Sequence, residues 1–166
     1  MTSASSKSSD RITLFLIFFV IILTAEYFMF YMLAPDFADW QRFGTAKVLF
    51  AILNLFGLPI TLSKDIITIG KAALRIVYEC TGGFAFFIFS SATLAYPNTW
   101  KNKILAQIIG LVGIFILNIV RLVMISLVAY KSISAFHFIH KYLWQVTFPV
   151  VVILMFILWT KYIDRE

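Results

Sequence analysis

Cysteine is almost absent from this sequence, which has a single one, Cys80, among 166 residues. One cysteine excludes an intramolecular disulfide, and it excludes a metal site built from several cysteines of this chain. Charged residues are also scarce, at 13% of the chain, whereas hydrophobic residues make up 61% and the mean hydropathy is +0.93. Soluble domains carry about a quarter charged residues, so this composition indicates an integral membrane protein.

Acidic residues are few as well, eight against fourteen basic ones, which gives a formal net charge of +6. A basic chain can bind nucleic acid, but here the lysines and arginines are scattered singly along the sequence. We therefore assign them to loops that face lipid headgroups and water. The expected surroundings are the lipid bilayer, and no nucleic-acid partner is predicted.

Four apolar stretches are predicted to cross the membrane, because a spanning helix needs about 20 residues. They are residues 12–33, 81–96, 104–130 and 136–160. Residues 1–11 are polar and Ser-rich, which predicts a short disordered cytoplasmic tail. The first apolar run is too long for the core of a signal peptide, so we expect it to be retained. Residues 12–166 are then one membrane-embedded domain.

Residues 34–80 interrupt this series of spans. Residues 34–40 are predicted to form a loop, and residues 41–56 an interfacial or re-entrant helix, because Arg42, Lys47 and Asn54 interrupt its apolar pattern. From Gly57 the hydrophobic period changes to two, which predicts a small β-meander with turns at residues 63–65 and 70–71. The alternating residues are Ile60, Leu62, Ile66, Thr68, Leu74, Ile76 and Tyr78.

The predicted fold class is therefore an all-α integral membrane protein with about four transmembrane helices, an interfacial helix and a small β-meander before the second span. Four spans place the N-terminus, residues 97–103 and the C-terminus on one side of the membrane. The basic residues of that side lie in very short segments beside helix ends, which is typical of the cytoplasmic face. Residues 34–80 and the loop 131–135 are then extracytoplasmic.

A few polar residues within the predicted spans lie at a common depth. Cys80 precedes the second span, so it lies at the outer edge of the membrane, and His140 lies near the start of the fourth span at the same edge. Arg121 is 17 residues beyond Ile104, so it is roughly 25 Å from the cytoplasmic face. Asn118 is three residues before Arg121 and shares its helix face.

These residue types suit thiol chemistry. A cysteine is nucleophilic as its thiolate, which a helix N-terminus and a nearby cation favour. Arg121 could supply that cation or hold an oxyanion, and His140 could relay protons. The glycines after Thr81 would let a substrate backbone approach closely.

Structural interpretations of the same residues remain open. A lone membrane cysteine is often an inert small hydrophobe, and Glu26 in the first span is explained by a structural hydrogen bond or a place near the interface. Interfacial histidines such as His137 and His140 often face headgroups, and Trp144 suits an aromatic belt. Arg121 differs, because a deeply placed arginine is functional by default.

The sequence resembles the exosortase/archaeosortase family of membrane cysteine transpeptidases, in a short, exosortase-H-like form. The matching segments are Gly57-Leu58-Pro59 before the β-rich stretch, Glu79-Cys80-Thr81-Gly82, Asn118-Ile119-Val120-Arg121, and a histidine that opens the last span. The resemblance covers roughly residues 50 to 160. Larger exosortases have more spans and usually one residue between the Glu and the Cys, whereas here Glu79 directly precedes Cys80.

The resemblance implies a catalytic set of Cys80, Arg121 and His140, with His137 as the rival histidine. Further residues are expected to bind substrate or support the site: Glu79, Thr81, Gly82, Asn118, His137 and Trp144. The implied activity is cleavage of a C-terminal sorting signal of exported proteins, which consists of a short motif, a membrane span and a basic tail. No cofactor or metal is expected. The acyl acceptor stays open between water, an amine and a lipid.

Two other functions are compatible with the residues alone. The chain could be a metal-binding or transport subunit with Glu79, Cys80, His137 and His140 as mixed ligands. It could also be a membrane scaffold whose polar residues only join helices. A fixed cation at Arg121 disfavours the metal site, and a scaffold gives no reason for Cys, Arg and His to share one depth.

Overall fold

The computed structural model describes residues 3–33 and 35–163, and it leaves undescribed the side chains of residues 3–8, 31, 33, 137, 138 and 140–147. The helices are α1 (Ser3–Phe28), the π-helical η1 (Met29–Leu33), α2 (Pro35–Leu55), the 3₁₀ turn η2 (Tyr78–Thr81), α3 (Gly83–Ala95), α4 (Trp100–Lys131) and α5 (Ile133–Ile163). The strands are β1 (Ile60–Ser63), β2 (Ile66–Ile69) and β3 (Ala72–Arg75).

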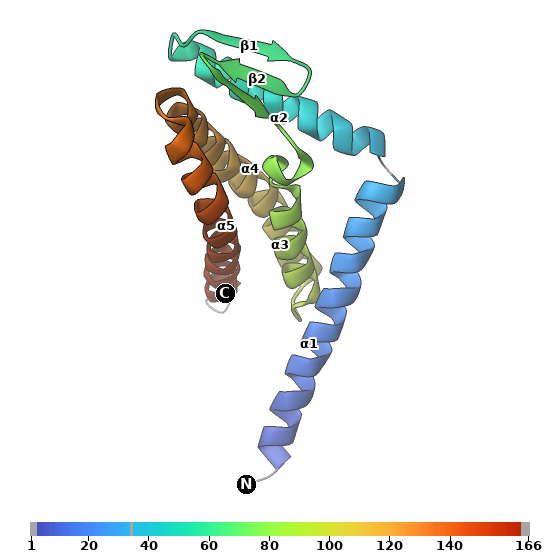
Figure 1. Ribbon diagram of the computed structural model, residues 1–166. Helices are drawn as coiled ribbons and strands as arrows, with labels where there is room; N and C mark the ends of the chain where they lie inside the picture. Colours follow the sequence, from blue (N-terminus) through green and yellow to red (C-terminus); the bar gives the residue numbers. More distant parts are fainter. Residues whose placement is uncertain (1–2, 34, 164–166) are drawn as a thin grey trace.

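Figure 1 shows α1, α3, α4 and α5 extending from one end of the molecule, where α2 runs across their ends with the sheet on its outer side. The start of α1, the turn between α3 and α4, and the last turns of α5 lie at the opposite end. The sequence predicted that these two ends face opposite sides of the membrane, and that assignment stays a prediction.

The N-terminal segment differs from the prediction of a disordered tail. Residues from Ser3 to Arg11 continue α1, because no glycine or proline interrupts the helix there and serines are tolerated in it. The hydroxyl of Thr13 donates to the carbonyl of Ser9 at 2.9 Å, which bonds the polar segment to the apolar one. The structure therefore describes Ser3–Arg11 as helix, where the sequence predicted a disordered tail.

The predicted loop at residues 34–40 is also wrong for its described part, because α2 begins at Pro35. Proline suits the first turn of a helix, where its missing N–H costs no hydrogen bond, and Asp36 complements the helix dipole. The helix predicted for residues 41–56 is therefore about two turns longer at its start.

The β-meander is confirmed as a three-stranded antiparallel sheet in the order β1-β2-β3. Its turns fall at Lys64-Asp65 and Gly70-Lys71, as predicted, and Gly70 has a positive φ of 56°. The alternation in β2 has the opposite phase, since Ile67 and Ile69 are buried while Ile66 is exposed. The third strand ends at Arg75, before Ile76 and Tyr78.

The connections between the later helices are shorter than predicted. Residues 96–99 join α3 to α4, in place of residues 97–103, and Ser132 alone separates α4 from α5, in place of residues 131–135. The second predicted span, residues 81–96, begins as the helix α3 at Gly83 and ends at Ala95, because Tyr96 precedes Pro97 and takes an extended conformation.

Two hydrophobic clusters hold the fold together. The first joins α2 to the sheet and α4, with Leu49, Ile67 and Leu122 among its buried members, and it includes Cys80. The second joins α3, α4 and α5. In the second cluster a Cβ at Gly110 would lie 2.3 Å from the ring of Phe89, so only glycine allows α4 to approach α3 this closely.

Two described helical segments are long and apolar enough to cross a bilayer by themselves, Ser9–Phe28 and Trp100–Lys131. Two shorter apolar segments, Gly83–Ala95 and Phe148–Ile163, lie beside them. At 1.5 Å per residue α3 is about 20 Å long, less than the hydrocarbon thickness of about 30 Å. Four complete spans therefore remain a prediction.

Candidate active site

Cys80 lies in the short turn η2, between the sheet and the start of α3. Its backbone N–H donates to the carbonyl of Val77 at 2.9 Å, and its side chain is buried, with 7% of the residue exposed. Gly82 follows with a φ of +79°, a left-handed conformation that bends the chain from the turn into α3. The local sequence therefore presents the thiol just before a helix begins.

Asn118 of α4 fixes this turn from the membrane side. Its Nδ2 donates to the carbonyl oxygen of Cys80 at 2.8 Å, and the residue is fully buried. A Cβ at Gly82 would lie 3.3 Å from the Cβ of Asn118, so the glycine allows the turn to rest directly on α4. The structure thus brings Cys80, Gly82 and Asn118 together.

Arg121 lies one helical turn beyond Asn118 and is 4% exposed. Its guanidinium carbon lies 4.8 Å from the centre of the Phe148 ring on α5, a distance typical of a cation–π contact. Its charge acts on the Cys80 thiol. The structure therefore brings Arg121 to Cys80, as the sequence suggested.

The surroundings of the thiol have opposing effects on its acidity. Burial raises the pKa of the Cys80 thiol above its ordinary value, while the Val77 hydrogen bond and the positive charge of Arg121 act in the other direction. The negative charge of Glu79 adds to the rise. Because the net pKa is raised, the resting thiol holds its proton at neutral pH and needs a base to react.

Cys80 and Arg121 line different cavities. Cys80 lines one of about 260 Å³ together with residues of β3, α4 and the start of α5, among them Arg75, Ser126 and Phe136. Arg121 lines an apolar one of about 230 Å³ between α3, α4 and α5, with Leu117 and Val120 in its wall. The pair therefore lies between a cavity beneath the sheet and a cavity among the membrane helices.

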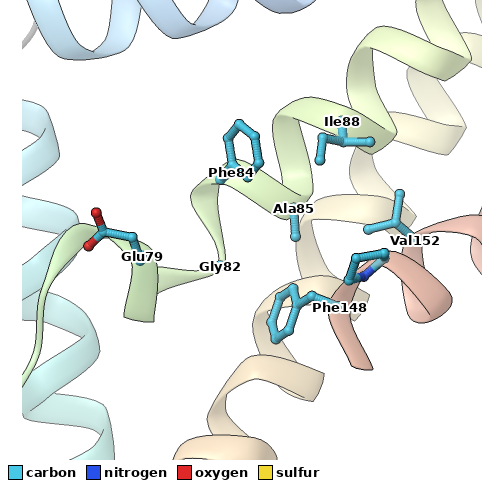
Figure 2. A pocket seen from close by; sticks show the side chains of 8 residues that line it. Glu79, Gly82, Phe84, Ala85, Ile88, Phe148 and Val152 are labelled. Carbon is cyan, nitrogen blue, oxygen red and sulfur yellow. The ribbon is translucent and has the colours of Figure 1, made fainter. Parts of the chain in front are cut away.

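A third cavity, of about 150 Å³, lies beside the turn and includes Glu79 and Gly82 in its lining. Figure 2 shows Ala85 of α3 facing Phe148 and Val152 of α5, while Glu79 lies at the other end, on the turn. Glu79 is exposed, whereas Thr81 is buried beside Cys80. Of the predicted supporting residues, Glu79 and Thr81 thus lie in the turn, Gly82 follows it and Asn118 contacts it.

Comparison with known families agrees with this geometry. The sequence matches the transmembrane exosortase family (Exosortase_EpsH) over residues 5–159. The chain belongs to this family. Exosortases are membrane proteins and are generally cysteine transpeptidases. Searches of curated proteins and of solved structures found no match.

The predicted histidines fall on a part of α5 whose side chains are not described. His137, His140 and Trp144 lie outside the described side chains, so their placement stays a prediction. The described residues on both sides of this part contact the site: Phe136 lines the Cys80 cavity and Phe148 packs under Arg121. Both histidines therefore lie, in sequence, between two residues that contact the site.

Glu26 of α1 is part of a separate polar cluster. Its two carboxylate oxygens accept hydrogen bonds from Ser90 at 2.6 Å and Ser91 at 2.9 Å, both on α3. This agrees with the structural interpretation of Glu26, since the bonds satisfy a carboxylate inside an apolar helix pair. Among the residues that the structure describes, no three His, Cys, Asp or Glu side chains gather as a metal site requires.

Helix α2 also contacts the cysteine turn, which the sequence did not predict. Tyr78 donates to a carboxylate oxygen of Asp39 at 2.6 Å, and the Thr81 hydroxyl lies 3.2 Å from the Gln41 amide. These partners are about 40 residues apart in sequence, and no motif marks them. The polar residues of α2 were interpreted only as signs of an interfacial helix.

Proposed function

We propose that this exosortase is a membrane-embedded cysteine transpeptidase or peptidase that cleaves the C-terminal sorting signal of exported proteins. Cys80 is the nucleophile, Arg121 the electrostatic catalyst and His140 the general base. The observation that carries this proposal is the meeting of Asn118 and Arg121, from one face of α4, with the Cys80 turn. Arg121 is buried, and its charge acts on a thiol. Because an arginine in a membrane helix is costly in free energy, a catalytic role explains why it is there.

The proposed chemistry gives each of the three residues one role. His140 accepts the thiol proton, and the Cys80 sulfur attacks the carbonyl carbon of the scissile peptide bond. The guanidinium of Arg121 stabilises the negative oxygen of the tetrahedral intermediate. Collapse of the intermediate breaks the C–N bond, and His140 returns the proton to the leaving amine. A second nucleophile, water or an amine, then attacks the thioester and restores the thiol.

Co-expression with an exported protein that carries a C-terminal motif, membrane span and basic tail tests this function. We expect wild-type enzyme to reduce the mass of that protein by the mass of the signal, adjusted for any acceptor that is added. Cys80→Ala should leave the substrate at its full mass, because no thioester can form. Equal processing by both proteins would contradict the proposal, and full-length substrate with both would contradict this class of substrate.

We also propose that the chain resides in the inner (cytoplasmic) membrane with Cys80 facing the periplasm or cell exterior. The short basic segments at the end of the molecule opposite the sheet support this orientation. A small membrane-impermeant thiol reagent should label wild-type protein in intact cells through the cavity beside Cys80. Cys80→Ala gives the background, because Cys80 is the only cysteine. Labelling that requires permeabilised cells would indicate the inverse orientation.

A further inference from the structure

The turn that carries Cys80 is held by side chains from two helices. Asn118 of α4 binds the Cys80 carbonyl, as described above, while Asp39 and Gln41 of α2 contact the residues on either side, Tyr78 and Thr81. The turn has only four residues, and these contacts reach three of them from other helices. Two of the three come from α2, which lies outside the helices that carry the proposed catalytic residues.

Gln41 completes the hydrogen bonds of Thr81. The Thr81 hydroxyl donates to the carbonyl of Tyr78 at 2.7 Å and accepts the N–H of Gly83 at 3.2 Å. The Thr81 hydroxyl also lies 3.2 Å from the amide oxygen of Gln41, so its single proton is shared between two acceptors, that oxygen and the Tyr78 carbonyl. The amide also touches the start of α3, because a Cβ at Gly83 would lie 3.2 Å from it.

Asp39 holds the other end of the turn and is itself fixed. Its Oδ1 accepts from the Tyr78 hydroxyl at 2.6 Å and lies 3.1 Å from the Arg42 guanidinium. Arg42 lies in turn 5.1 Å from the centre of the Tyr78 ring. The bond to Asp39 raises the pKa of Tyr78, so the hydroxyl keeps its proton and remains a donor.

Helix α2 also packs firmly against the part of α4 that carries Arg121. Ala46 and Leu49 of α2 are fully buried in the cluster that contains Ile119 and Leu122, the α4 neighbours of Arg121. A side chain on α2 that holds the turn therefore also sets the separation of Cys80 from Arg121. Packed interiors transmit such constraints because they have little room to deform.

We propose that Gln41 and Asp39 are positioning residues, which hold the turn Tyr78–Thr81 so that the thiol of Cys80 meets the guanidinium of Arg121. This role rests on the proposed function of Cys80 as the nucleophile. Neither residue touches the substrate bond. Both act through the turn, and α2 serves as the fixed support of the nucleophile.

Alkylation of Cys80 as a function of pH tests the proposal without a substrate. The full chain, purified in detergent micelles, is treated with iodoacetamide, and the rate is followed by intact mass. In Gln41→Leu the turn is released, which changes both the burial that raises the pKa of the thiol and the charge of Arg121 that lowers it, so the midpoint of the profile should shift by about half a unit. Below the midpoint the alkylation rate should change about threefold, with the thiolate fraction. Cleavage, where a substrate is available, should slow about threefold to tenfold through kcat.

Gln107→Leu is the matched control. Gln107 of α4 also bonds a threonine of α3, Thr93, at 2.7 Å, but near the end of α3 that lies away from Cys80. The Gln107→Leu variant should at most lower the melting temperature, and it should leave the alkylation midpoint unchanged. Tyr78→Phe, which removes only the hydroxyl that binds Asp39, is the second test and decides the matter if Gln41→Leu does not fold.

The outcomes are distinct. A shifted midpoint in Gln41→Leu or Tyr78→Phe, with Gln107→Leu at the wild-type value, supports the positioning role. Wild-type midpoints in the folded Gln41→Leu and Tyr78→Phe variants, or the same shift in Gln107→Leu, would overturn it. If wild-type enzyme cleaves no sorting signal, the proposed function fails, yet the alkylation profiles still decide whether α2 positions the thiol.

Discussion

Arg121→Met should leave a folded, membrane-inserted protein that binds its substrate but cleaves it roughly 100-fold more slowly or worse. Arg121 is buried, and its contact with Phe148 is one that an apolar side chain of similar length can replace by packing. A buried charge seldom repays its desolvation, so methionine should preserve or raise stability. The loss of activity is then due to the missing positive charge beside Cys80, which methionine cannot supply.

Single-turnover cleavage rates and melting temperatures of the same preparations check this expectation. Arg121→Lys should also be poor, because a compact ammonium cannot reproduce the planar guanidinium against a carbonyl oxygen. Lys131→Met, at the exposed end of the same helix, is the matched control and should keep the wild-type rate. A near wild-type rate in Arg121→Met would show that the site as argued is wrong.

His140→Ala should abolish processing, and His137→Ala should weaken it at most. The raised pKa of the buried Cys80 thiol means that the resting site holds a thiol, so removal of the base should cost about 100-fold or more. His140 matches the family pattern better and lies deeper in the last helix. The segment that carries it runs between Phe136 and Phe148, which both border the site.

The two histidine variants are compared in the same co-expression assay, with membrane levels matched. Each is the other's control, because they lie three residues apart on one helix. Loss with His137→Ala and activity with His140→Ala would transfer the role of base to His137 and keep the site. Full activity in both variants would remove histidine from the mechanism.

Much of the fold was predictable because its determinants are local. The change of period after Gly57 indicated the sheet, and Gly70 marked one of its turns. Element boundaries were less predictable. Pro35 begins a helix where a loop was expected, and a single residue, Ser132, joins two helices. In both cases the residue type suits a turn and a helix terminus equally, and tertiary packing decides between them.

The candidate site also has a part that the sequence could predict and a part that it could not. The spacing of Asn118 and Arg121 fixed their common helix face, and the topology fixed their depth, so their approach to Cys80 could be anticipated. The support from α2 could not. Gln41 and Asp39 contact Thr81 and Tyr78 only after the chain folds the sheet over α2. No local sequence pattern in α2 or in the turn indicates that the two segments meet.

The covalent state of Cys80 during turnover tests the central claim most directly. Purified wild-type enzyme is mixed with substrate, quenched in acid, and its intact mass and Cys80 peptide are measured. The account predicts an adduct with the mass of the substrate's N-terminal acyl fragment, without the released C-terminal signal, linked to Cys80 as a thioester and released by neutral hydroxylamine, and no adduct in Cys80→Ala. Cleavage of the substrate by Cys80→Ala, or an adduct on another residue, would contradict it.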